Sequence, residues 1–361
     1  MTSTTAHAHL RAPPPPGAAA LRENNFDALR LIFASMVVVF HVGLLSRAPS
    51  LALATQVSAT FAVQAFFVVS GFLVTMSFEN SSSLIIFAKK RLRRILPAYV
   101  FVVAAAALAL CAMSTLAPAD YFGHPEFWRY LGFNLVLSNF SAPGLPEVFQ
   151  SNVETAVNGS LWTIKIEVAF YCVVPLLVWA VRRYGMARTL ATVFVGSVMW
   201  KLGFGLAFAS SGSEIYAKLA KQLPGQLSFF VGGAWAFYRT RAGAGVPGWA
   251  AALGAVAYFF ATGTPLDVVA PLAVTAIVGW AAVGAPSLPR AGKHGDFSYG
   301  VYLYHFPLVQ VFVALGVFQW SPFAACVMLA ALVAVSAVAS WFFVEEPMLY
   351  PQAGTVRLTT R

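Results

Sequence analysis

Long apolar runs separated by short polar or basic stretches dominate the chain. A helix needs about 20 mostly apolar residues to cross the hydrocarbon core of a bilayer. Ten segments are candidates for such helices. They are residues 27–46, 53–78, 95–117, 162–181, 189–210, 222–238, 247–262, 265–284, 297–318 and 322–344. The pattern predicts an all-α fold, a polytopic membrane helix bundle with about ten transmembrane helices.

One further apolar segment, residues 127–140 (FWRYLGFNLVLSNF), is too short to span and is typical of a re-entrant or interfacial piece. It lies in the one long loop, residues 118–161, which the order of the helices places on the outer face. Long loops in compact proteins are often functional, so we expect this loop to face substrate. No internal repeat is visible, which weakly disfavours a transporter built from two inverted halves.

Basic residues cluster in alternate loops, whereas the loops between them carry few cations. The clusters contain Lys89, Lys90, Arg91, Arg93, Arg94, Arg182, Arg183, Arg188, Arg239, Arg241, Arg290 and Lys293, with Arg357 and Arg361 near the end. By the positive-inside rule, this alternation predicts that these loops and both termini are cytoplasmic. The net charge of +10 is therefore attributed to membrane topology, and we expect no nucleic acid partner.

Composition agrees with a membrane protein. The chain is 59% hydrophobic, against roughly 45–50% apolar residues in soluble domains, so lipid must solvate it.

Its three cysteines lie far apart in apolar runs, so no disulfide, metal site or redox motif is expected. A Pro run and no signal-peptide core predict a flexible cytoplasmic tail over residues 1–24. The membrane domain is expected over 25–348, with a second cytoplasmic tail over 349–361.

The first predicted helix carries ionisable residues, which inside a membrane suggest function. Arg30 and His41 are eleven residues apart, so they share a helix face about 16 Å apart along the axis. Asp27 lies one turn before Arg30 and can pair with it. Alternatively, Arg30 snorkels to the interface. His41 is either a hydrogen-bonded core imidazole or a general base that takes a proton from an alcohol.

The spacing of an Arg, ten residues and a His in the first membrane helix resembles the hallmark of the acyltransferase-3 family of bacterial membrane O-acyltransferases. FAVQAFFVVSGFLV (61–74) is similar to the family's second-helix pattern and contains Ser70 and Gly71. The resemblance implies a donor-binding role for Ser70 and Gly71, and Gly71 would also permit close helix approach.

KRLRRILPAYV resembles the family's Arg-x-x-Arg motif, which places Arg91 and Arg94 at the cytosolic boundary. These arginines are either a topogenic cluster or ligands for the phosphates of an acyl-CoA, since guanidinium groups bind phosphate through two hydrogen bonds. Both roles are compatible.

LWTIKIEVAFYCVVPLL (161–177) resembles the family's Trp-Ser-Leu-x-x-Glu-x-x-Phe-Tyr stretch. The match implies a substrate-contacting Trp162 and a catalytic Glu167 that orients an imidazole or holds a sugar hydroxyl. Alternatively, Glu167 is an interfacial acid paired with Lys165 or another cation. Lys165 and Val168 depart from the family pattern, and this departure concerns the specificity for the acceptor more than membership of the family.

DFSYGVYLYHFPLV (296–309) resembles the family's Ser-Tyr-x-x-Tyr-Leu-x-His-x-Pro helix, and WFFVEEPM resembles its closing signature at Glu345. Tyr299 and His305 are assigned to substrate binding by this resemblance, although His305 beside Tyr299 and Tyr302 also suits structural hydrogen bonding. We expect Glu345 to be an anchor or ion-pair partner. The matches run in order along nearly the whole chain.

The resemblance implies a multi-pass enzyme of the bacterial inner membrane that transfers an acyl group, usually acetyl from acetyl-CoA as co-substrate, to a hydroxyl. The implied acceptor is an envelope or exported carbohydrate, such as an exopolysaccharide, an O-antigen or a lipid-linked oligosaccharide or glycolipid. No permanently bound cofactor or metal is expected, and polysaccharide-assembly proteins are conceivable partners. Two alternatives are a transporter or flippase for an acyl donor or glycolipid, and an inactive membrane scaffold. His41, Arg30 and Glu167 are the catalytic candidates.

Overall fold

The computed structural model describes residues 17, 20–21, 23–288, 292–293 and 295–349. Most of the tail predicted over 1–24, residues 350–361 of the second tail, and Arg290, Arg357 and Arg361 of the basic clusters lie outside the described residues.

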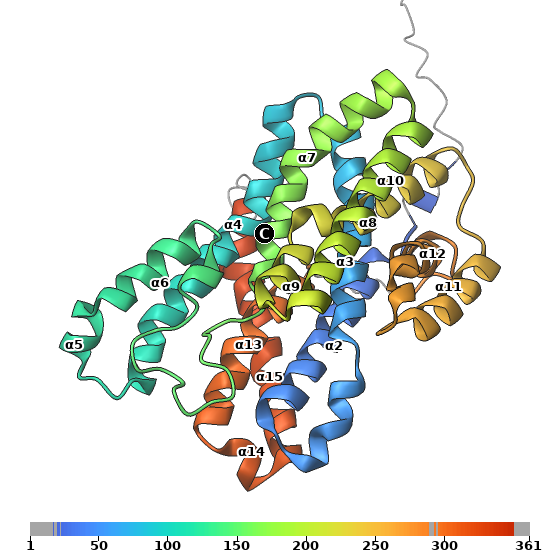
Figure 1. Cartoon of the computed structure of the whole chain (residues 1–361). Helices are drawn as coiled ribbons and strands as arrows, with labels where there is room; N and C mark the ends of the chain where they lie inside the picture. The colour runs from blue at the N-terminus through green and yellow to red at the C-terminus, as the bar shows by residue number, and fades with distance from the viewer. Residues whose placement is uncertain (1–16, 18–19, 22, 289–291, 294, 350–361) are drawn as a thin grey trace, which may run out of the picture.

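All regular secondary structure in the described part of the chain is helical, without any strand, which confirms the all-α prediction (Figure 1). The longer helices are α2 (Phe26–Ser46), α3 (Ala59–Glu79), α4 (Leu84–Ala109), α6 (Pro125–Leu135), α7 (Trp162–Tyr184), α8 (Met186–Ser211), α10 (Leu223–Arg241), α11 (Gly248–Ala261), α12 (Ala270–Val283), α13 (Ser298–Ala314) and α15 (Pro322–Ser340). The shorter ones are η1 (Pro49–Gln56), η2 (Leu110–Met113), α5 (Pro118–Gly123), η3 (Asn139–Ser141), α9 (Glu214–Ala220), η4 (Pro265–Val269), α14 (Val317–Trp320), a π-helical turn η5 (Trp341–Glu345) and α16 (Glu346–Leu349).

Each of the ten predicted segments lies on a helix, but only seven described helical stretches are long and apolar enough to cross a membrane. The other three segments correspond to α10, α11 and α13. Helices α11 and α13 have 14 and 17 residues, which is short for a span. Helix α10 is long enough, but buried polar residues such as Gln226 and Ser228 lower its hydropathy. The chain is a multi-pass membrane protein, whereas ten spans and cytoplasmic termini remain predictions.

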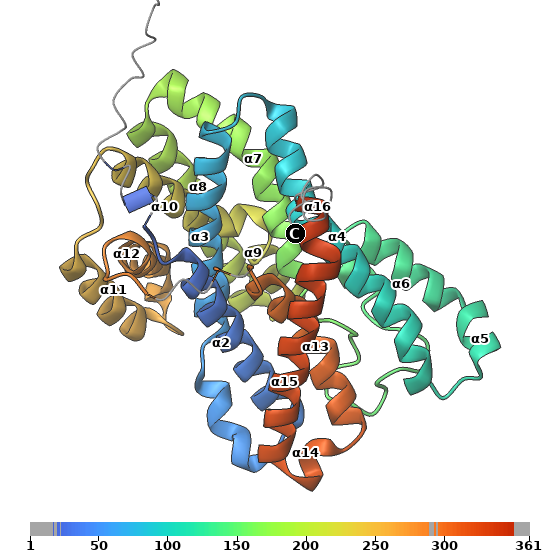
Figure 2. The ribbon, with the colours of Figure 1, turned by 180° about the vertical axis from the view of Figure 1, so that it is seen from behind.

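Helix α3 runs through the middle of the bundle, with α10 against one side and α2 against another (Figure 1). Helices α2, α13 and α15 form one group, α11 and α12 lie at one edge, and α5 and α6 extend from the opposite edge, as the reverse view shows (Figure 2). A Cβ at Gly71 would lie 2.0 Å from the carbonyl oxygen of Phe230 on α10, and one at Gly233 would lie 1.9 Å from that of Val68. The close helix approach predicted at Gly71 is confirmed.

The long loop 118–161 divides into two parts. Helix α6 lies beside α4, and the Tyr99 hydroxyl donates to the carbonyl of Asn134 at 2.8 Å. The later part, residues 142–161, runs beside α13: Gln310 Nε2 donates to the carbonyl of Ala156 at 2.8 Å, and Asn158 Nδ2 donates to that of Leu303 at 2.9 Å. Non-helical backbone within a membrane bundle needs such partners. The segment that enters the bundle is therefore this later part, which the hydropathy pattern did not single out.

Candidate active site

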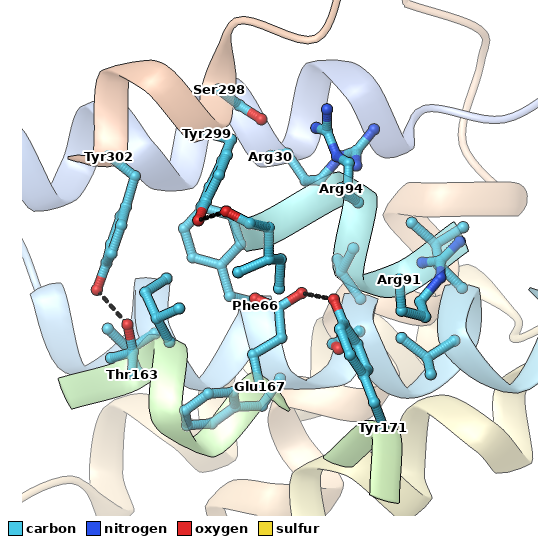
Figure 3. A pocket seen from close by; sticks show the side chains of 18 residues that line it. Arg30, Phe66, Arg91, Arg94, Thr163, Glu167, Tyr171, Ser298, Tyr299 and Tyr302 are labelled. Carbon is cyan, nitrogen blue, oxygen red and sulfur yellow. Dashed lines mark hydrogen bonds between the residues drawn. The ribbon is translucent and has the colours of Figure 1, made fainter. Parts of the chain in front are cut away.

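A cavity lies between α2, α3, α4, α7 and α13, lined by charged and aromatic side chains (Figure 3). It brings together six of the predicted site residues: Arg30, Ser70, Arg91, Arg94, Glu167 and Tyr299. Four others, His41, Gly71, Trp162 and His305, do not line it. Gly71 faces α10, and Trp162 is the first residue of α7.

Arg30 and Arg94 belong to one ion-pair network. Arg30 contacts Asp27 at 2.5 Å and Asp296 at 2.9 Å, and Arg94 pairs with Asp296 and, at 3.5 Å, with Glu345. The predicted Asp27–Arg30 pair is thus confirmed, and Glu345 is an ion-pair partner as expected. Asp296 connects the two arginines, so their charges are largely compensated inside the protein.

Asp296 was not among the site residues predicted from sequence. Its Oδ1 accepts hydrogen bonds from the Ser298 backbone N–H and hydroxyl at 3.3 and 2.5 Å. Burial by itself would raise the pKa of this carboxyl, but the guanidinium groups of Arg30 and Arg94 and the Ser298 hydrogen bonds hold that pKa below its usual value. The carboxylate therefore stays ionised. The signal for Asp296 in the sequence was an acid two residues before Ser298 of the Ser-Tyr motif.

Arg91 differs from these two arginines. It forms no salt bridge with any described residue, and its Nε is buried without a hydrogen-bond partner. Its guanidinium carbon lies 5.9 Å from the centre of the Tyr171 ring, apart from the Arg30–Arg94 pair (Figure 3). The exposed Lys89 and Lys90 precede it on α4. Arg91 thus has donors available for an anion in the cavity.

Glu167 faces the cavity from α7 and accepts a hydrogen bond from the Tyr171 hydroxyl at 2.8 Å (Figure 3). Lys165 points elsewhere, because its Nζ donates to Gln222 Oε1 at 2.8 Å and lies 4.6 Å from the centre of the Phe140 ring. The alternative of a Glu167–Lys165 ion pair is therefore wrong. A carboxylate with one oxygen held by a tyrosine can bind a donor group of a substrate.

His41 lies near the other end of α2 from Arg30 and contacts His305 of α13, with 2.9 Å between His41 Nδ1 and His305 Nε2. His305 is fully buried. It is one turn beyond Tyr302, whose hydroxyl is 2.7 Å from Thr163 Oγ1 and which lines the cavity. The imidazole pair therefore lies beyond the Tyr302 end of the cavity. Tyr302 and Thr163 were not predicted as site residues.

Comparison with known proteins shows to which family the chain belongs. The model of a family described as an acyltransferase domain matches residues 23–342, which contain the residues that line the cavity, Arg30 and Arg94 with their shared partner Asp296, and both imidazoles. The chain belongs to the acyltransferase-3 family. It is 27% identical over 375 residues to nodulation protein 10 of Rhizobium leguminosarum bv. viciae, covering 90% of this chain and 93% of that protein. It is 28% identical over 309 residues to an O-acetyl transferase of Shigella phage Sf6, covering 81% of this chain and 86% of that protein.

No solved structure matches the chain. The family match and the phage relative show that this acyltransferase-3 protein is an O-acyltransferase enzyme. The cavity and the imidazole pair together form its candidate active site.

Proposed function

We propose that this protein transfers acetyl from acetyl-CoA to a hydroxyl of an envelope or exported carbohydrate at the bacterial inner membrane. The observation that carries the proposal is that two features lie next to each other along α13. An arginine-lined cavity comes first, and an imidazole pair follows one helical turn further along. The relative named O-acetyl transferase supports acetyl as the acyl group.

The donor's phosphates are assigned to Arg91. Arg30 and Arg94 have acidic partners in the folded protein, so a phosphate would have to compete with carboxylates for them. Arg91 has no such competitor among the described residues and can offer a guanidinium fork. We assign Arg30 and Arg94 to positioning: with Asp296 they tie α2, α4 and the start of α13 together beside the cavity.

The thioester end of the donor then extends into the cavity past Ser70, Glu167 and Tyr299. Ser70 Oγ is buried without a hydrogen-bond partner, so a polar atom of the donor would satisfy it. Glu167 accepts a hydrogen bond from an N–H or O–H of the bound substrate. These contacts place the acyl group toward Tyr302 and the imidazoles.

His41 is the proposed catalytic base. It accepts the hydroxyl proton while the acceptor oxygen attacks the thioester carbonyl. A carbon–oxygen bond forms, the carbon–sulfur bond breaks, and the coenzyme A thiolate leaves and takes up the proton that the His41 imidazolium releases. We assign the acceptor to the vicinity of the bundle-entering segment 142–161, which packs close to His41: a Cβ at Gly159 would lie 2.8 Å from the Phe306 ring, and Phe306 contacts His41.

The test measures transfer of radiolabelled acetyl from acetyl-CoA to the endogenous acceptor in membrane vesicles. Because general-base catalysis contributes about 10²–10⁴-fold, His41→Ala should lower the rate at least about 100-fold. Binding of acetyl-CoA should persist. Val39→Ala, at an exposed position on the same helix, is the control and should transfer normally. Normal transfer by His41→Ala would contradict the mechanism, and purified protein that neither binds nor consumes acetyl-CoA would contradict the donor.

A further inference from the structure

The hydrogen bond between His41 and His305 is nearly in line with both rings. The nitrogens are 2.9 Å apart, the ring centres are 5.1 Å apart, and the ring planes differ by 19°. The separation of the centres is close to the nitrogen–nitrogen distance plus the two ring radii. Each nitrogen therefore points at the other along its N–H or lone-pair direction, and one ring must donate while the other accepts.

The surroundings of His305 decide which ring donates. Its Nδ1 lies 2.8 Å from the carbonyl oxygen of Tyr302 and 3.3 Å from that of Val301. A carbonyl oxygen only accepts, so Nδ1 of His305 carries the proton. In a neutral imidazole the other nitrogen is then an acceptor. Nε2 of His305 thus accepts, and Nδ1 of His41 donates.

The charged form of His305 does not fit this position. The side chain is fully buried, and neither imidazole forms a salt bridge with a carboxylate in the part of the chain that the structure describes. A buried charge without an opposite charge is strongly disfavoured. His305 is therefore neutral, with its single proton on Nδ1.

The turn of α13 that holds His305 is fixed by its neighbours. Pro307 lies inside α13 and has no N–H, which leaves the carbonyl of Leu303 without its helical partner. Asn158 Nδ2 replaces that partner at 2.9 Å. The Phe306 ring packs on Gly159 and lies edge-on to His41, 4.9 Å between ring centres. The segment 142–161 thereby holds both imidazoles in place.

We propose that His305 is a positioning residue that fixes the tautomer of His41. With its proton held on Nδ1, His41 keeps the lone pair of Nε2 available for the hydroxyl of the acceptor. When Nε2 takes that proton, His41 becomes an imidazolium whose Nδ1–H donates more strongly to His305, so the bond strengthens as charge develops. This inference rests on the proposed function, because it requires His41 to be the base.

Two substitutions separate this role from simple packing. In His305→Gln the side-chain amide can place its oxygen near the position of Nε2 and accept from His41, whereas His305→Leu fills space without an acceptor. Loss of such an outer partner typically costs about 10–100-fold or more. We expect His305→Leu to lower the maximal transfer rate about 100-fold with an unchanged KM for acetyl-CoA, and His305→Gln to stay within about tenfold of the wild type.

Equal or better activity of His305→Leu than of His305→Gln would overturn the proposal. The double variant His41→Ala/His305→Leu should be no slower than His41→Ala alone, and additive losses would also overturn it. If His41→Ala itself transfers normally, the proposed mechanism with His41 as the base fails, and the positioning role of His305 fails with it. If only His41→Ala is inactive while His305→Leu is active, the positioning role alone fails.

A spectroscopic measurement reads the tautomer of His41 directly in the wild-type protein. The chain contains six histidines, so nitrogen-15 labelling of histidine gives few signals, and subtraction of the His41→Asn spectrum identifies His41. We expect neutral His41 to carry its proton on Nδ1, the less common tautomer in solution. A proton on Nε2 of His41 would refute the inference.

Discussion

Asp296 is the residue whose removal should most disturb the ion-pair network beside the cavity. Its carboxylate contacts the Arg30 guanidinium at 2.9 Å and also pairs with Arg94, and its side chain is 13% exposed. In Asp296→Asn the side-chain shape and a hydrogen bond to Ser298 can remain, but two neighbouring guanidinium groups lose their shared counter-charge. Glu345 still faces Arg94 at 3.5 Å, so the loss is partial.

The magnitude follows from burial. Removing one partner of a buried ion pair costs about 3–5 kcal/mol, and hydrogen bonds to charged groups are worth about 1.5–3 kcal/mol. Because Glu345 remains and the amide can still bond, we expect Asp296→Asn to lose about 2–3 kcal/mol. Asp27→Asn is the matched control: it removes the same charge from the same Arg30, but at a side chain that is 47% exposed. Exposed pairs contribute about 0–1 kcal/mol.

The assay is thermal unfolding of detergent-purified protein, read as the fraction that remains monodisperse after heating. Asp296→Asn should lose this fraction at a clearly lower temperature than Asp27→Asn. If both variants unfold at the same temperature, the network at Asp296 contributes nothing beyond a surface pair and the reasoning is refuted.

The same network gives a pH dependence. Because the pKa of Asp296 is lowered in the folded protein, its stabilisation is fully present above the pKa of an unfolded Asp and is lost as pH falls through the lower folded value. Stabilisation by Asp296 should therefore still be present at about pH 5 and be lost only below about pH 4, as measured by the difference in stability between wild type and Asp296→Asn. A difference that is no larger at about pH 5 than at about pH 3 would contradict this assignment.

Further predictions concern the donor site, the helix contact and the bundle-entering segment. Arg91→Ala should raise the KM for acetyl-CoA about 10–100-fold and leave the thermal stability unchanged, whereas Arg94→Ala should lower the thermal stability. Equal losses of thermal stability in the two variants would contradict the different roles of the two arginines. Gly71→Leu should prevent the α3–α10 approach and abolish folded, monodisperse protein, and normal elution of this variant would argue against that contact. Gln310→Leu removes the donor to the carbonyl of Ala156 and should make segment 142–161 more susceptible to protease, while Gln319→Leu, at an exposed position, should not; identical digestion would count against the anchoring role.

Local sequence was sufficient for features that depend on a single helix. Long apolar runs cannot avoid helical structure in a membrane, so every predicted segment lies on a helix. Arg30 and His41 share α2, and Asp27 pairs with Arg30 because residues three apart meet on a helix surface. The number of spans was harder to predict. Helix α13 is only 17 residues long, and the residues at which a helix begins and ends depend on the helices packed against it.

The sequence by itself thus determined an all-helical membrane enzyme of this family and six of the residues that line its cavity. Only the tertiary structure decided how they are paired. Arg94 meets Asp296 from 202 positions away, and His41 meets His305 from 264 positions away. Such pairs form when helices pack, and no spacing along the chain encodes them. That packing compensates Arg94, leaves Arg91 available at the cavity, and gives His41 a partner that a lone intramembrane histidine could not reveal.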